Sequence, residues 1–220
     1  MLVRHGQPVG HDGRCVGHFD TELAPSATSP LHFLAHSVTS PPALVISSDL
    51  RRCAGSAALL AGAWRSELRF DPRLRELSFG DWEGRRWSEI GETERAALDA
   101  WGTDWTRHSP PAGETGIGLA ARVQSALDHI LPLVELTSSG IAIVSHAGWI
   151  RVATTLLLGE SLSSALERSI DYAHAAVFSV RNGFATIQAW NVSQISDSQI
   201  SDSQISDADA RPRAPQPAPP

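Results

Sequence analysis

The sequence predicts an α/β fold: a three-layer α/β/α sandwich around a mostly parallel sheet with an antiparallel edge strand. A compact apolar run begins at Ala43 and is followed by apolar positions at helical spacing over 50–64. The same order returns where a strand over 141–144 precedes a helix over 148–158. Near the end, two β-prone runs flank Arg181-Asn182-Gly183, and an Asn-Gly pair favours a hairpin turn. The strand–helix alternation predicts the parallel part of the sheet, and the hairpin predicts its antiparallel edge.

The remaining elements follow from the same rules. A short apolar strand begins at Leu2 and ends before Gly6. A long helix is expected over about 120–136, interrupted by Pro132, because proline lacks a backbone N–H and clashes with the preceding turn. The helix over 148–158 is expected to end at Gly159, since glycine readily adopts the left-handed backbone found at helix C-termini.

The composition changes near the C-terminus. From Ser193 the pentapeptide SQISD occurs three times in succession, and a Pro- and Ala-rich stretch ends the chain. Such a segment carries too little apolar surface to offset the entropy of ordering it. We therefore expect one folded domain over 1–192 and a disordered tail over 193–220.

Charge and cysteine content limit the possible partners and location. The formal net charge is −6 and the sequence pI is near 5.8, which argues against nucleic acid or an anionic membrane as the partner. The two cysteines, Cys15 and Cys53, lack the spacing of a disulfide framework or a metal knuckle. Neither a signal peptide nor a membrane-spanning run is evident. These features predict a cytoplasmic protein that acts on a small molecule, and they leave the oligomeric state open.

Polar side chains follow the predicted strands where α/β proteins place their ligands. His5 comes directly after the first strand, His146 follows the strand over 141–144, and Arg51 and Arg52 follow the strand that begins at Ala43. Because the carboxyl ends of parallel strands meet in one crevice, we expect these groups to converge. Arginine side chains suit phosphate, since their planar fork donates two hydrogen bonds and is always charged.

A neutral imidazole beside a bound phosphoryl group can act as a nucleophile, which predicts a phosphohistidine intermediate. Protonating the departing oxygen then needs an acid, and the stretch LRELSFGDWEG offers Glu76, Asp81 and Glu83. We expect bound phosphate to keep such a carboxyl group protonated.

Six motifs in order resemble the histidine phosphatase (phosphoglycerate mutase-like) superfamily. They are RHG at 4–6, GRCVGHFDTEL at 13–23, SSDLRRC at 47–53, LRELSFGDWEG at 74–84, PPAGET at 110–115 and VSHAG at 144–148. The resemblance covers most of the chain, from Leu2 to about Trp190. A single RHG tripeptide is weak evidence, whereas six ordered motifs are strong evidence.

The resemblance assigns roles to individual residues. It implies that His5 is phosphorylated, that Arg4 and Arg52 hold the phosphate, and that His146 completes the pocket. It also implies that Glu76 is the proton donor and that the main-chain N–H of Ala147 faces the phosphate. The superfamily's spacing selects Arg52 over Arg51, which is expected to face solvent.

The chain also departs from the superfamily pattern. Gln7, Pro8 and His11 replace the usual residues after RHG, which puts the side-chain contacts of that loop in doubt. Ala147 stands where glycine is usual, and Thr115 where serine is usual, and both changes are mild. Within the superfamily the motifs look most like bacterial alpha-ribazole phosphatases, which implies a place in cobalamin biosynthesis.

Each assignment has a simpler alternative. His5 and His146 taken singly could be buried structural imidazoles, and Asp81 with Glu83 could belong to a turn that packs Trp82. His11 and His18 show no metal-site spacing, and His174 has no assigned role. The chain also carries a tryptophan cluster that could pack a lid or form a stacking platform, of which lid packing is favoured: Trp82, Trp87, Trp101 and Trp105.

The sequence therefore predicts a phosphomonoesterase that needs no metal or other cofactor and acts on a small phosphorylated metabolite, alpha-ribazole 5′-phosphate being one candidate. Arginine and imidazole groups would supply the positive charge that Mg²⁺ supplies elsewhere. Two alternatives remain. One is a phosphoglycerate mutase-type phosphotransferase, and the other is a non-catalytic phosphate-binding module on the same fold.

Overall fold

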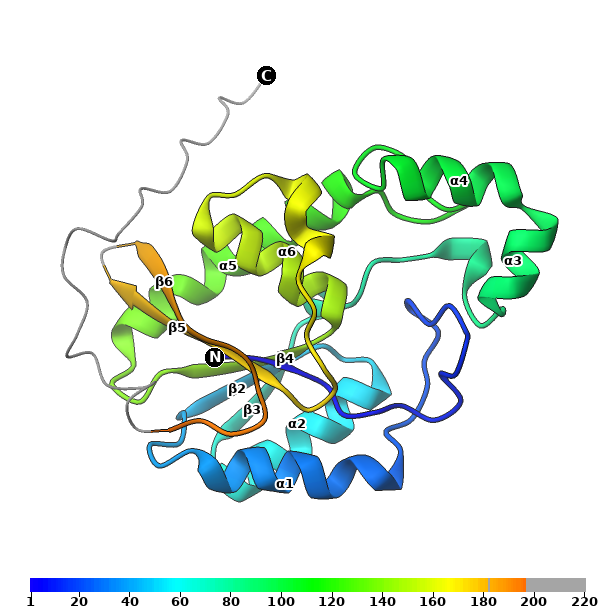
Figure 1. The fold of residues 1–220 in the computed structure, drawn as a ribbon. Coiled ribbons are helices and arrows are strands. Elements are labelled where there is room, and N and C mark those ends of the chain that lie inside the picture. Colours follow the sequence, from blue (N-terminus) through cyan, green and yellow to red (C-terminus); the bar gives the residue numbers. More distant parts are fainter. Residues whose placement is uncertain (182, 197–220) are drawn as a thin grey trace.

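A computed structural model describes residues 1–181 and 183–196, and within them a single six-stranded sheet separates two layers of helices (Figure 1). The strand order is β3-β2-β4-β1-β5-β6. Strands β1 to β4 pair in parallel, whereas β5 pairs antiparallel with both β1 and β6. The predicted three-layer α/β sandwich is confirmed, and its antiparallel edge consists of two strands. The strands are β1 Leu2–Arg4, β2 Leu44–Ser47, β3 Glu67–Phe70, β4 Ile141–Ser145, β5 Ala175–Arg181 and β6 Phe184–Val192.

The helices cover both faces of the sheet. Helices α1 and α2 pack on one face and α5 and α6 on the other (Figure 1). Successive strand residues face opposite layers: Ile141 and Ile143 join the α5/α6 side, while Ala142 and Val144 join the α1/α2 side. Burial on both faces explains why the central strands β2 and β4 are apolar almost throughout. The helices are α1 Thr28–Ser37, α2 Arg51–Trp64, α3 Trp87–Thr93, α4 Arg95–Thr103, α5 Gly116–Leu136 and α6 Ala147–Leu158.

A separate small cluster lies beside the sheet. Helices α3 and α4, with the turn around Trp82, extend beyond the sandwich (Figure 1). We call residues 79–103 the lid. Trp82 is fully buried there and packs edge-on against Trp87 and Trp101, whereas Trp105 belongs to the main core. Three of the four tryptophans therefore pack the lid together.

The expected interruption of the long helix at Pro132 is wrong. Helix α5 runs from Gly116 to Leu136 with Pro132 inside it. Pro132 is exposed, while the buried positions Val123, Leu127 and Ile130 carry the packing against the core. Apolar burial along the opposite side of the helix outweighs the destabilising effect of a proline near its end.

The other boundaries lie close to the prediction. Gly159 ends α6 with a left-handed backbone, at φ 66°. In the hairpin, Arg181 pairs with Phe184 across β5 and β6, and Asn182 of the predicted turn lies outside the described residues. Past β6 the chain stays packed to Ile195, whose side chain is 2% exposed and whose N–H donates to Ser37 Oγ. Residues 197–220 of the expected tail also lie outside the described part of the chain.

Candidate active site

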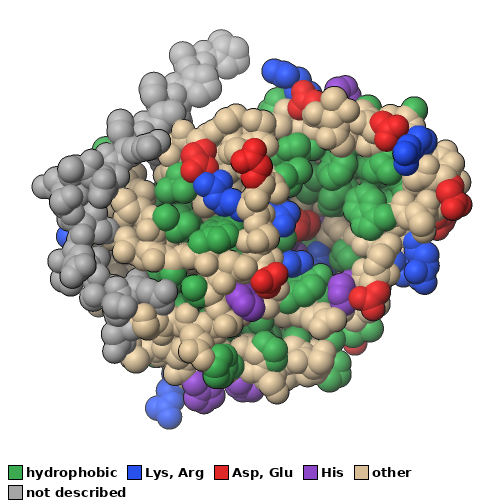
Figure 2. Space-filling model, viewed as in Figure 1, with side chains coloured by type: hydrophobic (Ala, Val, Ile, Leu, Met, Phe, Trp, Pro, Cys, Tyr) green, Lys and Arg blue, Asp and Glu red, His purple; other side chains and the backbone are tan. Residues whose placement is uncertain are grey.

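The strand register places three functional segments side by side. In the sheet Arg4 pairs with Ser145, and Ser47 pairs with Val144, so β1, β2 and β4 end at the same level. The next residues continue the pairing, because the N–H of His5 donates to the Ser145 carbonyl at 3.0 Å. His5 and His146 are consequently neighbours, with ring centroids 5.0 Å apart and ring planes inclined by 64°. Figure 2 shows a hollow in this face of the molecule with arginine atoms inside it, bordered by hydrophobic side chains.

The tautomer of His5 follows from its hydrogen bond. Nδ1 lies 2.7 Å from the Gly6 carbonyl, and a carbonyl oxygen can only accept, so Nδ1 carries the proton. The lone pair is then on Nε2. Gly6 itself is packed closely, because a Cβ at this position would lie 2.6 Å from that of Ala27. A glycine after His5 therefore lets this backbone pack closely against Ala27 at the start of α1.

Arg52 is 1% exposed and is held by backbone carbonyls. Its guanidinium donates to the carbonyls of Gly17 at 2.6 Å and Phe19 at 3.1 Å, and to Nδ1 of His146 at 3.1 Å. No carboxylate among the described residues neutralises this buried charge. A buried arginine without an ion-pair partner is costly, and it creates a strong local preference for an anion.

His146 is fixed through both ring nitrogens. Because Arg52 donates to Nδ1, the proton of the neutral ring is on Nε2, which donates to Ser48 Oγ at 2.9 Å. Cys53 Sγ lies 3.3 Å from the same nitrogen. Burial raises the pKa of the Cys53 thiol, so the thiol is protonated at neutral pH. Ser48 and Cys53 therefore position His146. The sequence analysis gave neither residue this role, although both lie within the SSDLRRC motif.

Both histidines are held in the neutral form. Burial lowers the pKa of His5 well below its usual value, and the positive charges of Arg52 and Arg4 lower it further. Burial also lowers the pKa of His146, and the electrostatic influence of Arg52 and then of His5 lowers it further. An imidazole whose lone pair is free at neutral pH can act as a nucleophile.

Arg4 lies near His5 and is held by a different set of contacts from Arg52. Its guanidinium donates to the Ile170 carbonyl at 2.7 Å, and its central carbon lies 3.6 Å from the ring centroid of Tyr172. Tyr172 in turn lies 5.5 Å from the His5 ring and 5.4 Å from the His11 ring. The tyrosine thus orients Arg4 by a cation–π contact. The sequence analysis missed Tyr172, because nothing local marks a residue 168 positions later in the chain as a partner of Arg4.

Glu76 lies at the N-terminus of α6. Its carboxylate accepts hydrogen bonds from the N–H groups of Gly148 and Trp149, each at 3.1 Å. A Cβ at position 148 would lie 2.4 Å from Oε1 of Glu76, so a glycine is needed for this approach. Ala147 is the first residue of α6, and its N–H has no intrahelical acceptor. The predicted acid and the predicted backbone donor are therefore adjacent, at the end of the helix that follows His146.

The backbone of Glu76 is held by two further side chains. Nε2 of His18 donates to its carbonyl at 2.7 Å, and Arg122 donates to the same oxygen at 2.9 Å. Arg122 also pairs with Glu114 of the PPAGET motif. Thr115 of that motif accepts from the Gly118 N–H as the N-cap of α5. The contacts of Glu114 and Thr115 therefore support the loop that carries Glu76, through Arg122 and the start of α5.

The competing candidates take other places. Glu83 Oε1 accepts from the N–H groups of His18 and Phe79, so it joins two loops. Asp81 is exposed. Arg51 pairs with Glu22 at the surface.

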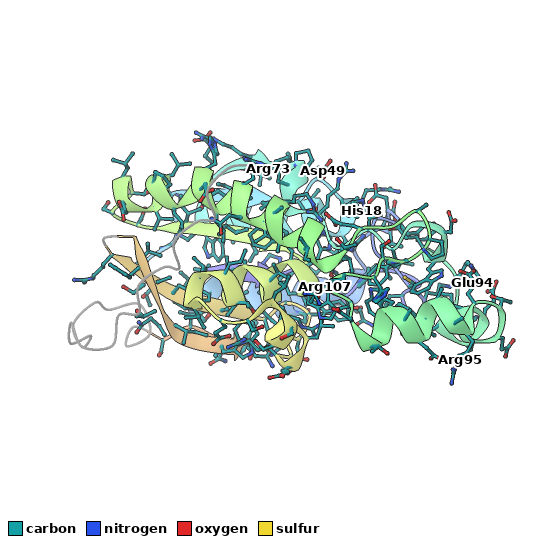
Figure 3. The ribbon with its side chains drawn as sticks, turned by 90° about the horizontal axis from the view of Figure 1, so that it is seen from above. His18, Asp49, Arg73, Glu94, Arg95 and Arg107 are labelled. Atoms are coloured by element: carbon teal, nitrogen blue, oxygen red, sulfur yellow. The ribbon has the colours of Figure 1, made fainter. Side chains whose placement is uncertain are left out.

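The remaining histidine candidates surround His5 and His146 without hydrogen bonding to either ring. His18 lies near Asp49 at the end of the sandwich that faces the lid (Figure 3). His174 Nδ1 donates to the Tyr172 carbonyl. Among the described residues, no group of three or more His, Cys, Asp or Glu side chains is arranged to hold a metal ion. Within the same residues, no helix is long and apolar enough to cross a membrane.

Known proteins resemble this chain along most of its length. A sequence profile of the Histidine phosphatase superfamily (branch 1) matches residues 1–193. The adenosylcobalamin/alpha-ribazole phosphatase of Escherichia coli K12 is 27% identical over 194 residues, covering 86% of this chain and 94% of that protein. A glucosyl-3-phosphoglycerate phosphatase of Mycolicibacterium vanbaalenii is 33% identical over 176 residues, covering 72% of this chain and 73% of its own. The crystal structure of the alpha-ribazole phosphatase from Shigella flexneri superposes with a TM-score of 0.81 at 26% identity, covering 88% of this chain and 96% of that one.

Proposed function

Because this chain belongs to the histidine phosphatase superfamily, we propose that it is a phosphomonoesterase whose nucleophile is His5. The observation that carries the proposal is the hydrogen bond from His5 Nδ1 to the Gly6 carbonyl, which leaves the Nε2 lone pair available. The lowered pKa of this buried ring, caused by burial and by Arg52 and Arg4, keeps the lone pair free at neutral pH.

The phosphate pocket consists of Arg4, Arg52, His146 and the N–H of Ala147. Arg52 has no carboxylate partner among the described residues, and His146 is fixed beside it at 3.1 Å. Preorganised donors and positive charge of this kind stabilise the charge that develops on a transferring phosphoryl group. Ser48 and Tyr172 hold His146 and Arg4 in place.

The reaction proceeds in two displacements. Nε2 of His5 attacks phosphorus, the bond from phosphorus to the ester oxygen breaks, and Glu76 gives its proton to the departing alcohol. Water then attacks the phosphohistidine, Glu76 accepts a proton from that water, and inorganic phosphate leaves while His5 is restored.

The substrate is a small phosphorylated metabolite. Relatives named for alpha-ribazole and for glucosyl-3-phosphoglycerate make esters of either kind candidates, and alpha-ribazole 5′-phosphate would place the protein in cobalamin biosynthesis. The net charge of −6 supports a small-molecule partner rather than nucleic acid or an anionic membrane. The two free cysteines support action in the reducing cytoplasm.

The decisive experiment combines turnover with labelling. Wild-type protein is expected to release phosphate from 4-nitrophenyl phosphate in the presence of a chelator, and brief exposure to a labelled ester should leave an acid-labile phosphoryl group on the protein. His5→Ala should abolish both signals. His36→Ala, at an exposed position on α1, is the matched control and should retain both. Turnover that survives His5→Ala would refute the nucleophile. Phosphoryl exchange on phosphoglycerate without net phosphate release would instead identify a mutase, and phosphate binding without turnover would identify a binding module.

A further inference from the structure

Arg151 lies on the side of α6 that faces the candidate site. It follows Gly148 by three residues and Ala147 by four, so these residues share one face of the helix. Glu76 packs directly against Gly148 on that face. Long helical side chains lean toward the helix N-terminus, and the Arg151 side chain therefore extends back toward the acid and the phosphate pocket.

The buried Nε atom of Arg151 lacks a hydrogen-bond partner, and its charge lacks an ion-pair partner, within the described residues. Arg4 shares this condition, with an unpaired Nε and no ion pair. By contrast, three other half-buried arginines are paired: Arg73 with Asp71, Arg75 with Asp49, and Arg122 with Glu114. Leaving a partly buried charged donor unsatisfied is costly, which indicates that its partner arrives from outside the chain.

Arg151 is also close to Arg4. Burial lowers the pKa of Arg4, Tyr172 and Glu76 counteract this, and the positive charge of Arg151 lowers it further. Asp171 is the remaining carboxylate that acts on Arg4, and it accepts a hydrogen bond from Asn191. In the proposed function Arg4 and Arg52 hold the phosphate that is transferred, and Arg151 adds a third guanidinium near Arg4.

We propose that Arg151 binds a second anionic group on the alcohol half of the substrate, a carboxylate or a further phosphate. The proposal rests on the phosphatase function above and narrows its substrate class to phosphate esters of acidic alcohols. An ester of a neutral alcohol would leave Arg151 without a partner in the complex. Arg151 is thus a specificity-determining residue, separate from the groups that carry out phosphoryl transfer.

A matched pair of esters tests this directly. In 3-phosphoglycerate a carboxylate replaces the terminal CH₂OH of glycerol 3-phosphate, and the two are otherwise alike. Each is measured as a substrate and as a competitive inhibitor of 4-nitrophenyl phosphate hydrolysis, so that a comparison is obtained whatever their turnover. Wild-type protein is expected to favour 3-phosphoglycerate by about tenfold or more, the usual size of a charge-assisted hydrogen bond.

Three variants separate specificity from chemistry. Arg151→Gln should remove the preference while changing 4-nitrophenyl phosphate hydrolysis less than about threefold, and Arg151→Lys should restore part of it by restoring the charge. Arg95→Gln is the control, because Arg95 points outward from α4 and its side chain is 72% exposed (Figure 3); it should leave the preference unchanged. Equal Ki values for the two esters in wild-type protein, or an equal effect of Arg151→Gln on both, would overturn the inference while leaving the phosphatase function intact. Absence of turnover of 4-nitrophenyl phosphate and of both esters would defeat the inference and the phosphatase function together.

Discussion

Replacing Gly148 by alanine should impair the acid step by displacing Glu76. The new methyl carbon would lie 2.4 Å from Glu76 Oε1, so the carboxylate has to move by about 1 Å to reach ordinary contact distance. It then loses the hydrogen bonds from the N–H groups of residues 148 and 149. Two such bonds at about 1.5 kcal/mol each outweigh the gain of about 1 kcal/mol that alanine brings to a helix. We therefore expect the free energy of unfolding to fall by about 2 kcal/mol, although helix propensity alone predicts a rise.

The kinetic effect should depend on the leaving group. A misplacement of 1 Å costs about 100-fold in a step that needs the displaced group. The phenol oxygen of phenyl phosphate needs a proton as it departs. The leaving group of 4-nitrophenyl phosphate is a more acidic phenol, which departs readily as the 4-nitrophenolate anion without a proton. Gly148→Ala should therefore lower kcat/KM about 100-fold for phenyl phosphate and less than tenfold for 4-nitrophenyl phosphate. The control is Gly62→Ala in α2, where a Cβ meets nothing within 4 Å. If both glycine variants behave alike on both esters, Glu76 is not the acid that this geometry indicates.

Two further predictions concern the histidines and Arg4. Burial and the charges of Arg52 and Arg4 lower the folded-state pKa of His5, and burial lowers that of His146, so the unfolded chain binds more protons below pH 6.5 and stability falls as pH decreases. Together the two rings should lower the free energy of unfolding by about 3 kcal/mol between pH 7.5 and 5.5. In a His5→Asn/His146→Asn double variant, chemical denaturation should show a loss of stability over this pH range that is smaller by that amount. The same loss of stability in wild type and double variant would contradict the assignment of both rings as neutral. Tyr172→Phe should keep the cation–π contact and a near-normal kcat/KM, whereas Tyr172→Leu should lower kcat/KM about fivefold by releasing Arg4. Steady-state kinetics with 4-nitrophenyl phosphate measures both variants. Equal losses of kcat/KM in the two variants would show that the aromatic ring does not orient Arg4.

The sequence by itself determined the elements whose cause is local. The spacing of apolar residues reflects which faces of a segment are buried. This spacing alone therefore predicted strand β2 followed by helix α2, and strand β4 followed by helix α6. Chain direction then placed His5, Arg52 and His146 at strand ends, and parallel pairing requires such ends to share one edge. Glu76 could be named because a family motif marked it, whereas its spacing from Asp81 and Glu83 carried no distinction.

The tertiary structure decided the contacts between distant segments. Glu76 meets the N-terminus of α6 across 72 residues, and Arg4 meets the Ile170 carbonyl across 166. Such contacts depend on strand register and helix packing, which summed local preferences do not specify. The same holds for Pro132, where burial along one side of α5 overrides a local signal that favours a break. It holds for Arg151 as well: its position in a helix can be read from the sequence, but its lack of a partner beside Arg4 appears only once every nearby carboxylate has been placed.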